Sequence, residues 1–136
     1  MNAASPDQAP YQDQALDHEF VRTFRLAALQ AGAVASHLQG KVRGGTKNGG
    51  TPEAEALTAV DLATQDVILH LLHDRLPAVA MDAEEDTATV ALFQGGDPGA
   101  ALVVVDPVDG TLNYIRGSRD YAVTGALVRD ARYTAA

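Results

Sequence analysis

The sequence predicts an α+β domain in which two helices precede a set of strands. Before residue 77, two long segments carry apolar side chains at helical spacing. After residue 77, short apolar runs alternate with turn-forming residues, which is the pattern of strands. The connections between the last strands are short, and this favours antiparallel pairing because parallel strands need long crossovers. We therefore expect two N-terminal helices packed on a largely antiparallel sheet.

The first helix is predicted from Gln14 to Leu38. One face of this segment is apolar at every third or fourth residue: Leu16, Phe20, Phe24, Ala27, Ala31, Val34 and Leu38. Gly40 then provides a helix stop. Residues 1–13 are polar and contain two prolines, so we expect a flexible tail there and a single domain over residues 14–136.

The second helix is predicted to begin at Thr51 and to close before Pro77. Thr51 is a good N-cap residue, and Pro52 suits the first helical position. An apolar stripe follows at Leu57, Val60, Val67 and Leu71. Residues 44–50 are too rich in glycine for a helix or strand, so we expect a loop there that carries one cation, Lys47.

Four strands are predicted in the second half of the chain. The first covers residues 78–81 and leads into the acidic cluster 82–86. The central strand contains Leu102–Val105, an apolar run bounded by turn formers, as expected of a buried strand. Residues 121–128 and 132–136 are predicted to form the last two strands, joined by a tight turn.

The central strand leads into residues 106–111, which read Asp-Pro-Val-Asp-Gly-Thr. Pro107 cannot donate to a sheet ladder, so we expect the strand to end at Asp106 and a helix to form within 108–115. The first amides of that helix, at Gly110 and Thr111, would then point toward the carboxylates. Carboxylates beside anion-binding amides indicate a bridging cation. Mg²⁺ fits this role, because it takes oxygen ligands at about 2.1 Å and joins carboxylates to phosphate.

Composition limits the classes of partner. The chain has 18 Asp and Glu against 10 Lys and Arg, which argues against a nucleic acid polymer or an anionic membrane as the ligand. A small phosphorylated substrate would instead need a metal bridge. The chain has no cysteine, no apolar run near the ~20 residues of a membrane span, and a polar start unlike a secretion signal. We therefore expect a cytoplasmic protein.

The pattern of acidic residues resembles the inositol monophosphatase family of metal-dependent phosphomonoesterases. The family signature is similar to residues 106–111 followed by Asn113 and Tyr114. Three further family elements occur in the same order along this chain: a loop lysine at Lys47, a helical aspartate at Asp61, and a Glu-Glu pair that begins at Glu84. Ala83 stands where the family has glycine.

The resemblance implies a set of metal ligands. Glu84, Asp106 and the backbone carbonyl of Val108 would hold a first Mg²⁺, and Asp106 with Asp109 would hold a second. The implied cofactor is therefore Mg²⁺, bound by oxygen atoms alone.

The resemblance also implies catalytic and substrate-binding residues. The hydroxyl of Thr111, hydrogen-bonded to Asp61, would orient the attacking water together with Glu84. Gly110 and Thr111, with Asp109, would bind the substrate and its phosphate. Lys47 would approach the site from its loop.

The implied activity is Mg²⁺-dependent hydrolysis of inositol monophosphate or a related sugar or nucleotide phosphate, by a homodimer. Family members are considerably longer, so the resemblance predicts that this chain is the N-terminal half of the family's layered α/β sandwich, hence truncated. One alternative is a weak or inactive metal-binding remnant or assembly module. Another is a purely structural domain in which the motif occurs by chance.

Overall fold

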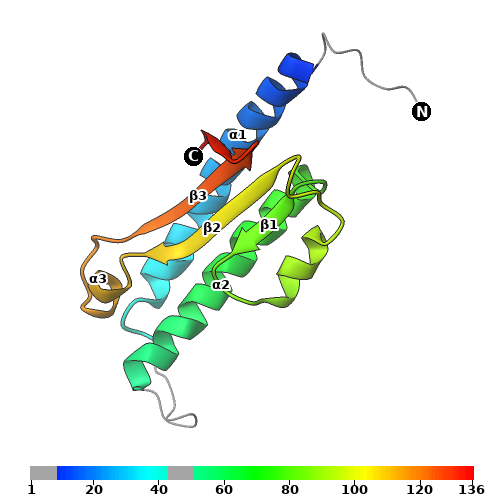
Figure 1. The fold of residues 1–136 in the computed structure, drawn as a ribbon. Helices are drawn as coiled ribbons and strands as arrows, with labels where there is room; N and C mark the ends of the chain where they lie inside the picture. Colours follow the sequence, from blue (N-terminus) through cyan, green and yellow to red (C-terminus); the bar gives the residue numbers. More distant parts are fainter. Residues whose placement is uncertain (1–8, 43–50) are drawn as a thin grey trace.

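A computed structural model describes residues 9–42 and 51–136 (Figure 1). In chain order the elements are α1 (Ala9–Leu38), α2 (Pro52–Arg75), β1 (Ala80–Ala83), the 3₁₀-helix η1 (Ala88–Phe93), β2 (Leu102–Asp109), α3 (Thr111–Ile115), β3 (Ala122–Arg129) and β4 (Arg132–Ala135). The helices come first and the strands follow, which confirms the predicted α+β class. Among the described residues, no helix has the length and apolar character needed to cross a membrane.

The four strands form one mixed sheet in the order β1-β2-β3-β4. β2 pairs antiparallel with β3, and β3 pairs antiparallel with β4, as expected. β1 instead pairs parallel with β2, with Ala83 opposite Val105. The segment that contains η1 returns the chain to the start of β2, and so supplies the longer connection that parallel strands require. The parallel pair places the ends of β1 and β2 at the same edge of the sheet.

α1 and α2 lie side by side against one face of the sheet (Figure 1). Their apolar stripes meet the inward side chains of the strands in one buried core, which includes Phe20, Phe24, Ile68, Leu69, Leu72, Val103, Val105 and Leu127. The rings of Phe20 and Phe24 stack with centroids 5.4 Å apart. Phe24 also lies directly over Gly125 of β3, where an added Cβ would come within 2.4 Å of the ring. The helical layer thus touches the sheet backbone there.

α1 begins at Ala9, so residues 9–13 are helical and the prediction of a tail over 1–13 is wrong for them. Pro10 does not prevent this start because proline is tolerated in the first turn of a helix. The start is also held by the sheet, since Arg129 donates to the carbonyl of Asp13 at 2.9 Å and to the carboxylate of Asp17 at 2.9 Å.

β2 continues through Pro107 to Asp109, so the prediction that the strand ends at Asp106 is wrong. The pairing register with β3 shifts between Asp106 and Asp109. An irregular stretch of this kind is one of the few places where a strand accepts proline. The helix that we expected within residues 108–115 is accordingly short and begins at Thr111.

A second, smaller core fixes α3 to the ends of the two long helices. Tyr114 is buried with Ala35, Val60 and Val108, and its hydroxyl donates to the carbonyl of Ala35 at 2.7 Å. Gln39, just after α1, donates to the carbonyl of Tyr114 at 2.9 Å and to that of Ser118 at 2.8 Å. These contacts place the segment after β2 beside α2.

Candidate functional site

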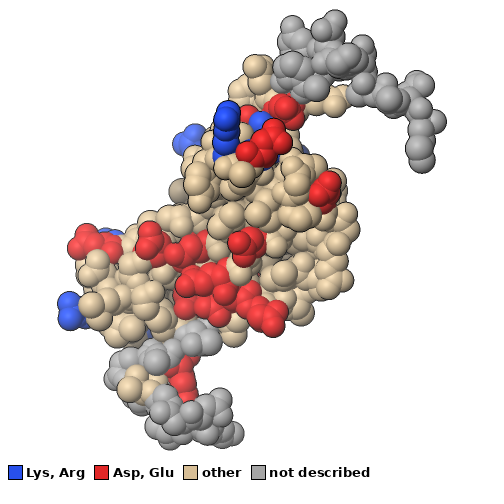
Figure 2. Space-filling view, in the orientation of Figure 1, with Lys and Arg blue, Asp and Glu red and all other residues tan. Residues whose placement is uncertain are grey.

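Five carboxylates come together where β1 and β2 end beside α2. They are Asp61 of α2, Glu84 and Glu85 in the turn after β1, and Asp106 and Asp109 of β2. Figure 2 shows acidic side chains gathered on this face of the molecule, over the ends of the two strands. The parallel pairing accounts for the arrangement, because the amide of Glu84 donates to the carbonyl of Val105 at 3.1 Å and so continues the ladder. Glu84 and Asp106 are therefore next to each other.

Glu84 lies beside Asp106. The largest cause that raises the pKa of Glu84, to about 7, is the side chain of Asp106, which can accept a hydrogen bond from protonated Glu84; partial burial and the charges of Asp106, Glu85 and Asp109 follow. The charged form of Glu84 is thus disfavoured by the carboxylates around it. A cation bound among them would offset this repulsion.

Asp61 lies nearly buried on α2, with 8% of its surface exposed. Burial raises the pKa of Asp61 to about 7, and the charges of Glu85, Glu84 and Asp106 contribute to the same shift. Its Oδ1 atom is buried and has no hydrogen-bond partner within residues 9–42 and 51–136. A buried carboxylate oxygen without a partner is unfavourable, so Asp61 is poised to accept a proton or to bind a donor.

The hydroxyl of Thr111 does not bond Asp61. It donates instead to the carbonyl of Val108, at 3.4 Å, so the predicted contact between Thr111 and Asp61 is wrong in this structure. The carbonyl of Val108 is itself an implied metal ligand. The amide of Val108 donates to Oδ1 of Asp106 at 3.1 Å. The side chains of Thr111 and Asp106 thus bond the nearby backbone of Val108, and Thr111 does not reach Asp61 on α2.

Gly110 has the geometry that the motif requires of a glycine. Its φ is +92°, in the left-handed region that other residues rarely adopt. A Cβ at this position would also lie 3.0 Å from the carbonyl of Asp120 and 3.2 Å from Cα of Tyr121. The chain can therefore turn from β2 into α3 only with glycine here.

The donor chemistry of this site fits a hard divalent cation, although a complete ligand set is not assembled. Glu84, Asp106, Asp109 and the carbonyl of Val108 supply only oxygen atoms, which Mg²⁺ prefers. Across the described part of the chain, no three His, Cys, Asp or Glu side chains are already arranged to hold a metal ion. Lys47 lies outside the described residues.

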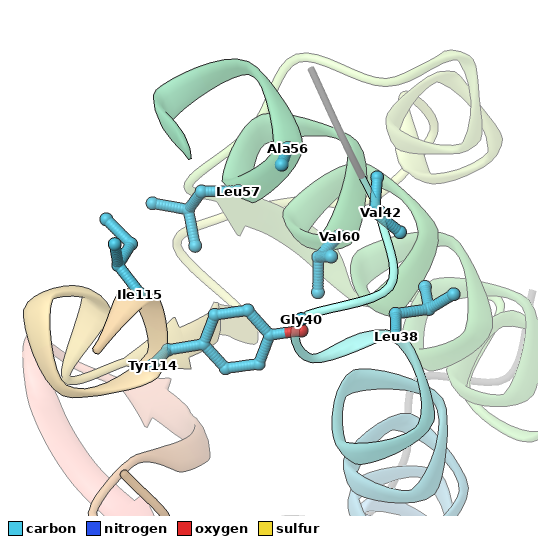
Figure 3. Close-up of a pocket in the computed structure, with 8 residues that line it drawn as sticks. All are labelled: Leu38, Gly40, Val42, Ala56, Leu57, Val60, Tyr114 and Ile115. Carbon is cyan, nitrogen blue, oxygen red and sulfur yellow. The ribbon is translucent and has the colours of Figure 1, made fainter. Parts of the chain in front are cut away.

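An apolar hollow lies near these carboxylates but is separate from them (Figure 3). It is formed by the end of α1, the start of α2 and α3, with Leu38, Leu57, Val60, Tyr114 and Ile115 among its lining residues. None of the five carboxylates lines it. The hollow therefore borders the smaller core and is no part of the candidate metal site.

One contact of the site was not predicted from the sequence. The buried side chain of Gln65, one helical turn after Asp61, bonds the backbone of Glu85. The available signal was its spacing of four residues from Asp61, which places both side chains on the same face of α2.

Comparison with known families agrees with the motif. The sequence profile described as the Inositol monophosphatase family matches residues 17–136. The chain belongs to the inositol monophosphatase family. Its structure resembles inositol monophosphatase from Anabaena (Nostoc) sp. PCC 7120, at 28% identity and a TM-score of 0.59, over 84% of this chain and 36% of that one. It also resembles CysQ from Bacteroides thetaiotaomicron, described as a bacterial member of the family, at 25% identity and a TM-score of 0.60.

Two further matches extend the comparison. The extragenic suppressor protein suhB from Bartonella henselae shares the fold at a TM-score of 0.63 and 21% identity, over 83% of this chain and 40% of that one. CysQ is covered to 38%, and 82% of this chain takes part in that match. The chain thus spans about two fifths of the length of these structures. An uncharacterized protein, y4fL of Sinorhizobium fredii (strain NBRC 101917 / NGR234), is 33% identical over 78 residues, 57% of this chain and 26% of that protein.

Proposed function

We propose that this chain carries the metal- and phosphate-binding part of a phosphomonoesterase that hydrolyses inositol monophosphate or a related sugar or nucleotide phosphate. The observation that carries the proposal is the pairing of β1 with β2, which brings Glu84 next to Asp106 beside the buried carboxyl of Asp61. Membership of a phosphatase family supports the reaction class. The net charge of −8 supports a small, metal-bridged phosphate as the ligand, since a nucleic acid polymer would be repelled.

The residues that would hold Mg²⁺ are Glu84, Asp106, Asp109 and the carbonyl of Val108. When bound, Mg²⁺ would offset the charge of the phosphate and make a coordinated water more acidic. Cation binding would favour the charged form of Glu84, because the positive charge would offset the neighbouring carboxylates.

The other residues would handle the proton and the phosphate. Asp61, with its pKa near 7, is suited to accept a proton from the attacking water at neutral pH. Thr111 would turn its hydroxyl from Val108 toward this water and orient it. The amides of Gly110 and Thr111 would bind phosphate oxygens where negative charge develops, and Asp109 would orient the substrate. Lys47 would add a positive charge from its loop.

A phosphate-release assay tests this proposal. Wild-type protein with Mg²⁺ is expected to release phosphate from inositol 1-phosphate or from one member of a panel containing 2′-AMP, fructose 1,6-bisphosphate and histidinol phosphate. Asp106→Asn is expected to lose at least about 100-fold in rate, because one shared ligand is removed. Asp74→Asn, an exposed charge at the end of α2, is the matched control and should retain the wild-type rate. Equal rates for both variants would contradict the proposal.

A second candidate is a metal-binding remnant or assembly module without catalytic activity. The observation that favours considering it is the hydroxyl of Thr111, which bonds the carbonyl of Val108 and not Asp61. It predicts saturable binding of Mn²⁺ that Asp106→Asn weakens, with no phosphate release above the metal-only rate for any substrate of the panel.

A further inference from the structure

The side chain of Gln65 bonds both the amide and the carbonyl of the Glu85 backbone. It is fully buried, with 0% of its surface exposed. Its Nε2 donates to the carbonyl of Glu85 at 2.7 Å, and its Oε1 accepts from the amide of Glu85 at 2.9 Å. Nε2 also donates to Oγ1 of Thr87 at 3.1 Å. Both hydrogens and the oxygen of the side-chain amide are therefore used.

These bonds fix the acidic turn, which we define as residues 84–87. On its other side the acidic turn is bonded to β2, through the amide of Glu84 and the carbonyl of Val105. Its far end is linked to α2 a second time, because Thr87 bonds Thr89 at 2.6 Å and Thr89 donates to Asp66 at 2.5 Å. The acidic turn is thus held between α2 and β2.

This hold acts against electrostatic repulsion. Asp106 on β2 is close enough to disfavour the charged forms of both Asp61 on α2 and Glu84 on the acidic turn. Repulsion among them favours movement of the acidic turn away from both neighbours. A buried, fully bonded amide resists that movement, since breaking it would leave buried polar atoms without partners.

The chemistry at position 65 requires a neutral amide. The side-chain amide of Gln donates from its nitrogen and accepts at its oxygen, and these adjacent atoms match the carbonyl and the amide of one backbone residue. An ionised glutamate of the same length would present only acceptor oxygens to the carbonyl of Glu85. It would also add a negative charge beside the cluster of carboxylates.

We propose that Gln65 is a positioning residue, which holds the acidic turn so that Glu84 and Asp106 can bind one divalent cation together. This inference rests on the proposed function, because it takes these two residues as metal ligands. Gln65 touches neither the cation nor the substrate and acts only through the backbone of the acidic turn.

The test measures Mn²⁺ affinity from the electron paramagnetic resonance signal of the free ion. Gln65→Met, of similar volume but without donors, is expected to bind Mn²⁺ about 10- to 100-fold more weakly than wild type. Gln65→Asn keeps the amide but is one methylene shorter, so it cannot span both atoms; it should show the same direction and decides the question if the methionine variant does not fold. Hydrogen exchange of the Glu85 amide should accelerate in both variants.

Ile68→Val is the matched control. It removes one methyl group from the core one turn further along α2, at a cost of about 0.5–1.5 kcal/mol, and should retain wild-type Mn²⁺ affinity. Wild-type affinity in the Gln65 variants, or an equal loss in Ile68→Val, would overturn the positioning role and leave the metal site intact. Absence of Mn²⁺ binding in wild type, or unchanged binding in Asp106→Asn, would overturn the proposed function and the positioning role with it.

Discussion

Two carboxyl groups of this chain, those of Asp61 and Glu84, lie in surroundings that disfavour their charged forms. Asp61 is buried on α2 with one oxygen lacking a partner among the described residues, and Glu84 lies next to Asp106. Both Asp61 and Glu84 have pKa values raised to about 7. In the absence of metal, these groups make the folded protein bind protons that an unfolded chain would release near pH 4. Stability must therefore depend on pH in a defined direction.

Asp61→Asn tests this dependence in metal-free protein. The folded-state pKa of Asp61 is above its unfolded value of 3.8, so its contribution is fully present below about pH 4 and is lost as pH rises toward 7. Wild-type stability should thus rise on acidification from pH 7.5 to pH 5, and Asp61→Asn should remove on the order of 1–3 kcal/mol of this rise. Urea unfolding at several pH values measures it.

Asp74→Asn serves as the control for this experiment, because Asp74 is exposed at the end of α2 and should leave the pH dependence unchanged. A wild-type curve that falls as pH decreases from 7.5 to 5 would contradict the environment that the structure gives to Asp61.

The secondary-structure elements show which parts of the fold are encoded locally. The two helices, the central strand and the final hairpin follow from periodicity and turn residues. The resemblance to the family selected Asp61, Glu84 and Asp106, and the structure places these residues near one another. The passage of β2 through Pro107 could not be predicted, because it depends on the register with β3. The contact of Gln65 with Glu85 depends on how α2 meets the turn after β1, which periodicity does not encode. The bond of Thr111 to Val108 is local, but it depends on the exact backbone path from β2 into α3.

The contact between α1 and β3 gives a prediction at this scale. Gly125→Val should destabilise the protein by about 1–3 kcal/mol, since its side chain would overlap the ring of Phe24 and force the helix away from the sheet. Ala126→Val is the matched control: it adds methyl groups at the next position of the same strand, on the opposite face. Thermal unfolding should show a lower midpoint for Gly125→Val alone. Equal midpoints for the two variants would show that the helix is not seated there.

At the scale of the whole molecule, the excess of negative charge affects stability. A net charge of −8, with five carboxylates at one edge of the sheet, makes self-repulsion a general term in stability. Screening should reduce this repulsion. The buried core that the two long helices share with the sheet offsets this repulsion.

Choline chloride provides the corresponding test, because carboxylates cannot coordinate its large quaternary ammonium cation as they would a metal ion. Between about 0.01 M and 1 M salt at pH 8, where the screening length falls from about 30 Å to about 3 Å, the unfolding midpoint of the metal-free protein should rise. Glu84→Gln should rise less, since it has one charge fewer in the cluster. A salt response that is identical in both proteins would show that the cluster does not contribute.

The parallel pairing of β1 with β2 has a consequence for how the chain reaches its native state. Asp61, Glu84 and Asp106 are separated by more than twenty residues from one to the next, so no local segment contains two of them. They meet only after distant parts of the polypeptide have closed on each other, which is the slow kind of step in folding. A divalent ion that needs both Glu84 and Asp106 would therefore bind tightly only after β1 and β2 have paired.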